Sequence, residues 1–225
     1  YMRKKREFLR QRFFQQINRV RMENLRSRIS PHFTFNVLGR EINQFNGSEE
    51  VKHNLMELVK YLRRSLELTE KLSVSLQDEL DFVRTYIELE RGRVGENFVA
   101  TITVEDGLDA TRIMIPSMIV QIPVENAIKH GLAGKDGKKE LMVYVSRETN
   151  GIRITVTDNG RGYLPQVVSA TRGTGTGLKV LYQTIQLLNT KNKSDKIRFN
   201  ITNRSDGQTG TEVSVYIPFR FSYDL

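Results

Sequence analysis

The hydrophobic residues of this chain change their spacing once, between residues 92 and 97, and this change restricts the folds open to it. Before it, apolar side chains recur at steps of three and four residues, the spacing of one face of an α-helix. After Gly92 and Gly95, short segments alternate between apolar and polar residues, the pattern of half-buried β-strands. We therefore predict a helical domain over residues 1–92 and an α/β domain over residues 93–225.

The first half contains two long helical patterns joined by a short polar turn. The first pattern ends at Asn46-Gly47-Ser48, and its seam has steps of 3, 4, 3 and 4 through Met22, Leu25, Ile29, His32 and Asn36. The second helix has an apolar face of Val51, Leu55, Leu58, Val59, Leu62 and Leu66. Such helices form an antiparallel hairpin, and a second copy would cover their apolar stripes. The prediction is a helical hairpin that forms a dimeric four-helix bundle.

A third helix and several strands are predicted beyond the hairpin. Ser75 and Asp78 fit a capping box for a helix that runs to about Glu90. Helical segments near 117–131 and 177–189 interrupt five alternating segments, at residues 98–104, 141–145, 152–158, 197–201 and 213–217. Asn150-Gly151, between two of these segments, favours a type I′ hairpin turn. This order predicts an α/β sandwich with a mixed sheet.

The positive charge of the chain lies almost entirely near its start. The whole chain carries +9, and residues 1–30 hold ten basic and two acidic residues, a balance of +8. The remaining residues, 25 basic and 24 acidic, are close to neutral. The basicity therefore belongs to one helix rather than to a folded surface, and no nucleic-acid partner is predicted. Anionic lipid head groups are the expected counter-charge.

The first residues suggest a nearby membrane. No apolar stretch reaches the roughly 18–20 residues of a membrane span, and no signal-peptide pattern is present. Tyr1-Met2-Arg3-Lys4-Lys5-Arg6 nevertheless looks like the cytoplasmic flank of a membrane helix, because aromatic residues mark the interface and basic residues the inside. A solvated helix start explains these residues equally well. We expect the cytoplasmic portion of a bacterial membrane protein, attached through a segment upstream of Tyr1.

Three segments of the second half carry residues suited to nucleotide binding. The first is Val124-Glu125-Asn126-Ala127-Ile128-Lys129-His130-Gly131, at the end of a predicted helix. Asn126, Lys129 and His130 stand at i, i+3 and i+4 and share one helical face. An amide oxygen can ligate Mg²⁺ and a lysine can contact phosphate, so this face suits a nucleoside triphosphate. The alternative is a polar helix end whose cations stabilise the helix dipole.

The other two segments are rich in glycine. Asp158-Asn159-Gly160-Arg161-Gly162 directly follows a strand; its carboxylate can accept a hydrogen bond from the adenine amine, and its glycines let the backbone approach a flat ring. Gly173-Thr174-Gly175-Thr176-Gly177-Leu178 precedes a helix, whose backbone N–H groups and dipole can hold phosphates. Taken singly, the first is also an ordinary turn and the second a flexible loop. The absence of cysteine excludes thiolate metal sites and cysteine nucleophiles.

In their order along the chain these segments resemble the ATP-binding domain that histidine kinases share with type II topoisomerases, Hsp90 and MutL. Gly210-Thr211, before the last strand, is similar to the final glycine box of that family. The resemblance implies an α/β sandwich of the GHKL type that binds ATP and Mg²⁺. It implies that Asn126 ligates Mg²⁺, that Lys129 and His130 contact phosphates, and that Asp158 binds the adenine amine. It implies further nucleotide contacts from Gly160, Gly162, Gly173, Gly175, Gly177, Leu178 and Thr211.

The upstream half indicates which member of that family the chain resembles. Arg28-Ile29-Ser30-Pro31-His32-Phe33-Thr34-Phe35-Asn36 resembles the phosphoacceptor motif, N-P-H-F-L-F-N, of LytS-type sensor histidine kinases. Tyr86-Ile87-Glu88-Leu89-Glu90-Arg91 is similar to the junction segment of the same family. Pro31 removes a helical hydrogen bond and bends the helix, which exposes His32. Asn36 lies one turn further and can orient the His32 ring.

This second resemblance implies a two-component histidine kinase that works as a homodimer. His32 would take the phosphoryl group from ATP and pass it to an aspartate of a separate response regulator. Asn36 would assist, and Glu125 is the candidate general base, because Phe33 occupies the place of the usual acid. Two alternatives remain open: a nucleotide-binding pseudokinase scaffold, and an ATPase of the topoisomerase or chaperone type.

Overall fold

The chain divides by packing into two compact units, residues 1–71 with Leu225 and residues 72–224. The computed structural model describes residues 54, 57–58, 60–62, 64–65, 67–68, 71–163, 176–190, 192 and 194–223. In the first unit the described residues up to Leu68 are helical, and Leu58, Tyr61 and Leu68 are buried. Most of the predicted hairpin, with His32 and Asn36, lies outside the described residues. The dimeric bundle and the division between residues 92 and 93 stay predictions.

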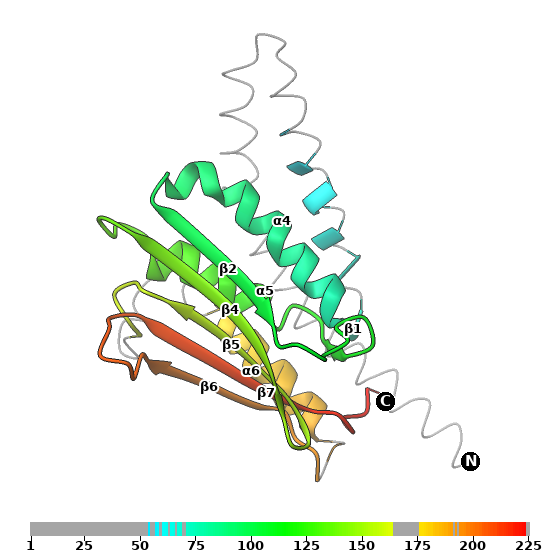
Figure 1. The fold of residues 1–225 in the computed structure, drawn as a ribbon. Helices are drawn as coiled ribbons and strands as arrows, with labels where there is room; N and C mark the ends of the chain where they lie inside the picture. The colour runs from blue at the N-terminus through cyan, green and yellow to red at the C-terminus, as the bar shows by residue number, and fades with distance from the viewer. Residues whose placement is uncertain are drawn as a thin grey trace, which may run out of the picture. The chain divides into compact units, whose positions relative to one another are not determined.

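The second unit is built on a mixed five-stranded sheet (Figure 1). The strands lie in the order β2 (Phe98–Val104), β4 (Lys139–Glu148), β5 (Gly151–Asp158), β7 (Thr211–Pro218) and β6 (Arg198–Asn203). β2 pairs in parallel with β4, with Phe98 opposite Lys139, and the other neighbouring pairs are antiparallel. The alternation of apolar and polar residues predicted these strands and a mixed sheet, and both predictions are confirmed.

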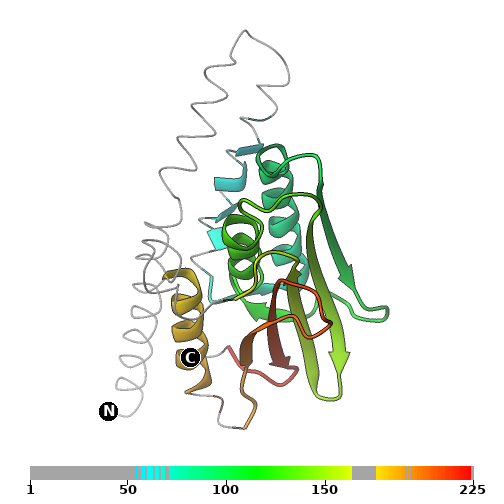
Figure 2. The ribbon, with the colours of Figure 1, turned by 90° about the vertical axis from the view of Figure 1, so that its left-hand side faces the viewer.

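The helices of this unit cover one face of the sheet (Figure 2). They are α4 (Leu76–Val94), α5 (Gln121–Asn126), the π-helical η1 (Ala127–Gly131) and α6 (Thr176–Asn189). The predicted N-cap of α4 is confirmed, since Ser75 Oγ accepts a hydrogen bond from Asp78 N at 3.0 Å. The Asp78 carboxylate accepts from the Ser75 hydroxyl at 2.8 Å instead of from its backbone N–H, and the helix continues to Val94 rather than ending near Glu90. Strands and helices bury a core that includes Val143, Val145, Ile154, Val156, Val215, Leu80, Val83, Ile119, Ile128, Leu181 and Ile185.

A separate two-stranded sheet joins the start of α4 to the segment that leads into α5. It pairs β1 (Ser73–Ser75) with β3 (Met114–Pro116) in antiparallel fashion, with Val74 opposite Ile115. The residues just before the two helices are therefore held side by side. Within the described part of the chain, no helix combines the length and the apolar character needed to cross a membrane.

The hairpin between β4 and β5 forms, but its turn differs from the predicted one. Glu148 pairs with Gly151, so the turn residues are Thr149 and Asn150, and Asn150 does not have a positive φ. The predicted type I′ turn centred on Asn150-Gly151 is therefore wrong. Gly151 is needed for a different reason, because a Cβ at this position would lie 2.3 Å from the backbone oxygen of Ile217 on β7.

Candidate functional site

Asp158, the last residue of β5, is a buried carboxylate held in a fixed orientation. Its side chain is 4% exposed, and Oδ1 accepts hydrogen bonds from Gly160 N at 2.8 Å and Thr211 N at 3.4 Å. Burial raises the pKa of Asp158, and the hydrogen bonds from Gly160 and Thr211 and the charge of Arg204 oppose that rise. The site thus offers a preorganised acceptor to a ligand that carries an N–H group.

Three glycines from different segments pack closely at or beside Asp158. A Cβ on Gly131, at the end of η1, would lie 2.9 Å from the Asp158 carboxyl atoms. A Cβ on Gly160 would lie 2.1 Å from the Gly131 oxygen, and one on Gly210 would lie 1.9 Å from the Asp158 backbone oxygen. At these three positions the backbone passes too close to its neighbours for a side chain to fit. Gly131 is not among the sequence-predicted ligands, although it directly follows His130.

We expect Gly160→Ala to weaken both the fold and the site. The new methyl group would meet the Gly131 oxygen at 2.1 Å, and backbone cannot yield as a flexible side chain does. Overpacking of this kind costs roughly 1–3 kcal/mol in the free energy of unfolding, which denaturant titration measures. Gly92→Ala is the matched control, because Gly92 lies in α4 and nothing surrounds its Cβ position within 4 Å. Equal unfolding midpoints for the two variants would contradict this account of Gly160.

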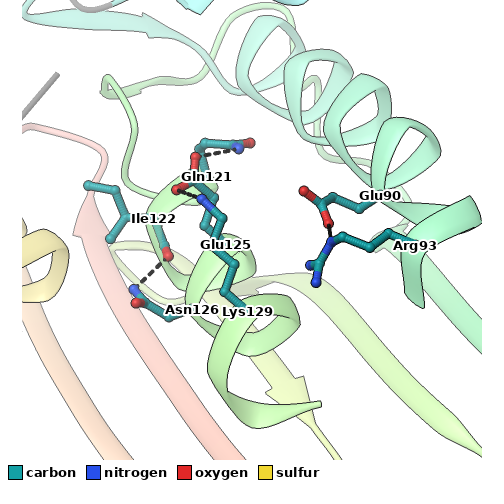
Figure 3. A network of polar contacts seen from close by, with 7 residues as sticks. All are labelled: Glu90, Arg93, Gln121, Ile122, Glu125, Asn126 and Lys129. Atoms are coloured by element: carbon teal, nitrogen blue, oxygen red, sulfur yellow. Dashed lines mark hydrogen bonds and ion pairs between the residues drawn. The ribbon is translucent and has the colours of Figure 1, made fainter. Parts of the chain in front are cut away.

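The side chains of Asn126 and Lys129 contact different residues. Asn126 Nδ2 donates to the Ile122 oxygen at 2.8 Å, which leaves the amide oxygen available as the outward acceptor. Lys129 Nζ lies 3.4 Å from Glu125 Oε2 and 5.9 Å from the centre of the Tyr86 ring on α4. Figure 3 shows the Lys129 ammonium beside Glu125 and the Asn126 amide on the side of Ile122. The metal and phosphate roles of these residues stay predictions.

Glu125 is buried among polar neighbours on its own helix. It is 7% exposed; Oε1 accepts from Gln121 Nε2 at 3.1 Å, and Oε2 pairs with Lys129. Glu90 on α4 is a second buried acid nearby, and its Oε2 pairs with Arg93 (Figure 3). Both oxygens of Glu125 are therefore engaged by donors. Its role as general base stays a prediction.

His130 is half-buried and sits among cations. Burial lowers its pKa, and the charges of Lys129 and Arg161 lower it further, while Glu125 opposes them. His130 is therefore mainly neutral at pH 7, and its contact with phosphate stays a prediction.

We expect His130 to titrate below 6.5, the ordinary value for histidine. The lowered pKa means that the unfolded chain binds this proton more readily, so His130 makes the fold less stable as the pH falls below about 6.5. Chemical shifts of the His130 ring followed by NMR from pH 5 to pH 8 measure this directly. A midpoint at or above the ordinary value would contradict the burial argument.

The structure describes some of the remaining predicted nucleotide ligands. Gly162 has φ +85°, a conformation that favours glycine, and a Cβ there would lie 2.7 Å from Asn203 Oδ1. Gly177 and Leu178 lie in the first turn of α6. Gly173 and Gly175 lie outside the described residues, and their contacts with phosphates stay predictions.

Two family models match consecutive parts of the chain. One, described as histidine kinase, matches residues 20–98. The other, described as histidine kinase-, DNA gyrase B- and HSP90-like ATPase, matches residues 111–220. The second range contains Asp158, its three glycines and the polar face of α5 and η1.

Curated relatives cover most of the chain. The sensor histidine kinase YpdA of Escherichia coli (strain K12) is 28% identical over 202 residues, which are 89% of this chain and 34% of the relative. The sensor histidine kinase/phosphatase LytS of Staphylococcus aureus (strain MRSA252) is 32% identical over 197 residues, 84% of this chain and 33% of the relative. The chain thus spans about a third of the length of these relatives.

A solved structure has the same fold. The histidine kinase domain of the blue-light activated histidine kinase of Erythrobacter litoralis EL346 superimposes with a TM-score of 0.51 at 16% identity, over 93% of both chains. The predicted fold class, a helical part followed by an α/β sandwich of the GHKL type, is confirmed. With both family models and relatives that span most of its length in agreement, the chain belongs to the LytS-type sensor histidine kinases.

Proposed function

We propose that this chain is the kinase portion of a two-component sensor. It transfers the γ-phosphoryl group of ATP to His32 and then to an aspartate of a response regulator. The observation that carries the proposal is the buried Asp158 carboxylate, held by backbone amides of Gly160 and Thr211 with Gly131 packed against it, inside the matched ATPase domain. A carboxylate held by two backbone amides, with glycine backbone packed closely against it, fits the amine edge of adenine.

The polar end of α5 and η1 fits the phosphate side of the same nucleotide. Asn126 has its amide nitrogen bound to the Ile122 oxygen, so its oxygen is the atom left to hold Mg²⁺. Bound Mg²⁺ would neutralise phosphate charge during phosphoryl transfer. Lys129, His130 and the glycines before α6 would bind phosphate oxygens, with Thr211 completing the adenine side.

In the transfer, the residues of this chain position groups and move one proton. A ring nitrogen of His32 uses its lone pair to form a bond to the γ-phosphorus, while the bond from that phosphorus to the β,γ-bridging oxygen breaks and ADP leaves. The ring N–H proton passes to a base, for which Glu125 is our candidate. Asn36 would orient the ring. Hydrolysis of the phosphoaspartate is not part of this step.

The partners follow from the family rather than from the site. A homodimer would complete the helical bundle, and a response regulator would receive the phosphoryl group. The basic segment before residue 30 would lie at the inner face of a bacterial membrane, reached through residues upstream of Tyr1. The histidine kinase match over residues 20–98 favours this function over an ATPase of the topoisomerase or chaperone type.

Transfer of a labelled phosphoryl group tests the proposal. The chain is incubated with Mg²⁺ and ATP labelled in the γ-phosphate, and the product is treated with acid or alkali. We expect label that alkali preserves and acid removes, the behaviour of a phosphorus–nitrogen bond. ATP labelled in the α-phosphate should leave no label. A chain that binds ATP but never acquires γ-label would be a nucleotide-binding scaffold instead.

A further inference from the structure

The helix that carries Asn126 does not cap its own N-terminus. α5 begins after Val120, whose side chain makes no capping hydrogen bond, and Gln121 and Ile122 in its first turn are buried. The first N–H groups of a helix have no partner within the helix, and leaving them unpaired in the core costs about 1–3 kcal/mol each. Another part of the chain must supply the acceptors.

Glu79 on α4 supplies them. Its Oε2 accepts from Met118 N at 2.9 Å, and its Oε1 accepts from Val120 N and Gln121 N, both at 3.1 Å. Glu79 is 0% exposed, so these bonds lie in the core, where a charge is tolerated only with such partners. A carboxylate at this position also interacts favourably with the positive end of the helix dipole.

The backbone before α5 is shaped around this carboxylate. Met118 has φ 70°, the only positive φ among the described non-glycine residues, and it directs its N–H to Glu79. A non-glycine residue in this conformation is under strain and is held there by its surroundings. The pairing of β1 with β3 brings the start of α4 beside this segment, so Glu79 reaches it from a fixed position.

We propose that Glu79 is a positioning residue for the metal-binding side of the nucleotide site, an inference that rests on the proposed function. Asn126 follows Gln121 on one short helix, at a rise of about 1.5 Å per residue, so a shift of the helix start displaces the Asn126 amide. Asp158 lies on β5, and its carboxylate is held by the amides of Gly160 and Thr211. The three hydrogen bonds of Glu79 involve neither of these residues nor Asp158. Glu79 therefore acts most directly on the metal-binding side of the site, and it reaches Asp158 only through Gly131 at the far end of η1.

Binding of ATP with and without metal tests this assignment. Affinity is measured by calorimetry on the full chain in Mg²⁺ and in EDTA, for wild type, Glu79→Gln and Glu88→Gln. Loss of a group that orients a metal ligand typically costs about 10- to 100-fold in metal affinity. In Mg²⁺, we expect the ATP affinity of Glu79→Gln to fall at least about tenfold. In EDTA, we expect a smaller fall, because Lys129 and His130 lie on the same helical run as Asn126. Glu88, an exposed acid on the same helix, is the control and should behave as wild type.

Other outcomes separate the possible failures. An equal loss in both buffers would mean that Glu79 only stabilises the fold, and unchanged binding in both would mean that it positions nothing; either result overturns the inference. A wild-type chain that binds no ATP in either buffer would overturn the proposed function instead. If Glu79→Gln does not fold, amide hydrogen exchange of the wild-type chain tests whether Glu79 holds the start of α5. Slow exchange of the Met118, Val120 and Gln121 amides is expected, and exchange at the rate of exposed amides overturns the inference.

Discussion

Replacing Asp158 by Asn is expected to abolish most ATP binding while raising the unfolding temperature of the nucleotide-free chain. The Asn oxygen can still accept from Gly160 and Thr211, but an N–H₂ group then faces the adenine amine, so two donors oppose each other. A hydrogen bond to a charged group contributes about 1.5–3 kcal/mol, or roughly 10- to 100-fold in affinity, before that opposition is added.

The gain in stability follows from the direction of the pKa shift. Burial raises the folded pKa of Asp158 above 3.8, so the folded chain favours the protonated acid. The contribution of Asp158 to stability is therefore full below 3.8 and is lost as the pH rises through the folded pKa. Asn does not titrate, so the variant avoids this loss.

Thermal unfolding at several pH values measures the expected gain in stability. The difference in unfolding temperature between Asp158→Asn and wild type should grow from pH 4 upward and then level off. Calorimetry with ATP at pH 7 measures the affinity. Asp106→Asn serves as the control, because Asp106 is an exposed acid outside the site. A variant that binds ATP as tightly as wild type would remove Asp158 from the adenine site.

Replacing His32 by Gln is expected to remove all acid-labile label from γ-labelled ATP. Glutamine has no nitrogen lone pair comparable to that of imidazole, so the phosphorus–nitrogen bond cannot form. ATP binding should remain, because Asp158 and the other proposed nucleotide ligands are unchanged. The expected result is complete loss of transfer with an unaltered affinity.

His53→Gln is the matched control for this experiment. His53 belongs to the same helical half and lies in no recognised motif, so its variant should label as wild type does. Equal label in wild type and His32→Gln would show that another residue accepts the phosphoryl group. Loss of label in both histidine variants would indicate damage to the helical half rather than removal of the acceptor.

Local patterns predicted most of the fold. The strands of the sheet alternate with a period of two because one face meets the helices, and this alternation is visible without any knowledge of pairing. The segments around Asn126 and Asp158 could be singled out because their chemistry is carried by neighbouring residues. The turn at Thr149 and Asn150 was predicted one residue late, since Gly151 serves packing against Ile217 rather than the turn itself.

What the sequence could not reveal depends on contacts between distant segments. Glu79 looks like any polar residue near a helix start, and its value as a cap appears only when Met118 and Gln121 are folded against it. Gly131 likewise has the sequence pattern of a helix terminator, and its closeness to Asp158 follows from the packing of η1 against β5. The hydrophobic periodicity of a segment indicates which of its faces is buried, but it does not indicate which atoms of other segments that face contacts.

The parallel pairing of β2 with β4 has a consequence for how the domain assembles. Parallel neighbours need a crossover connection, and here residues 105–138 form it, with β3, α5 and η1 along its length. Closing so long a connection costs more chain entropy than closing the hairpins elsewhere in the sheet. The connection that lets the edge strand pair in parallel thus also carries the helix bearing Asn126, so the edge of the sheet and that side of the candidate site are built from one continuous segment.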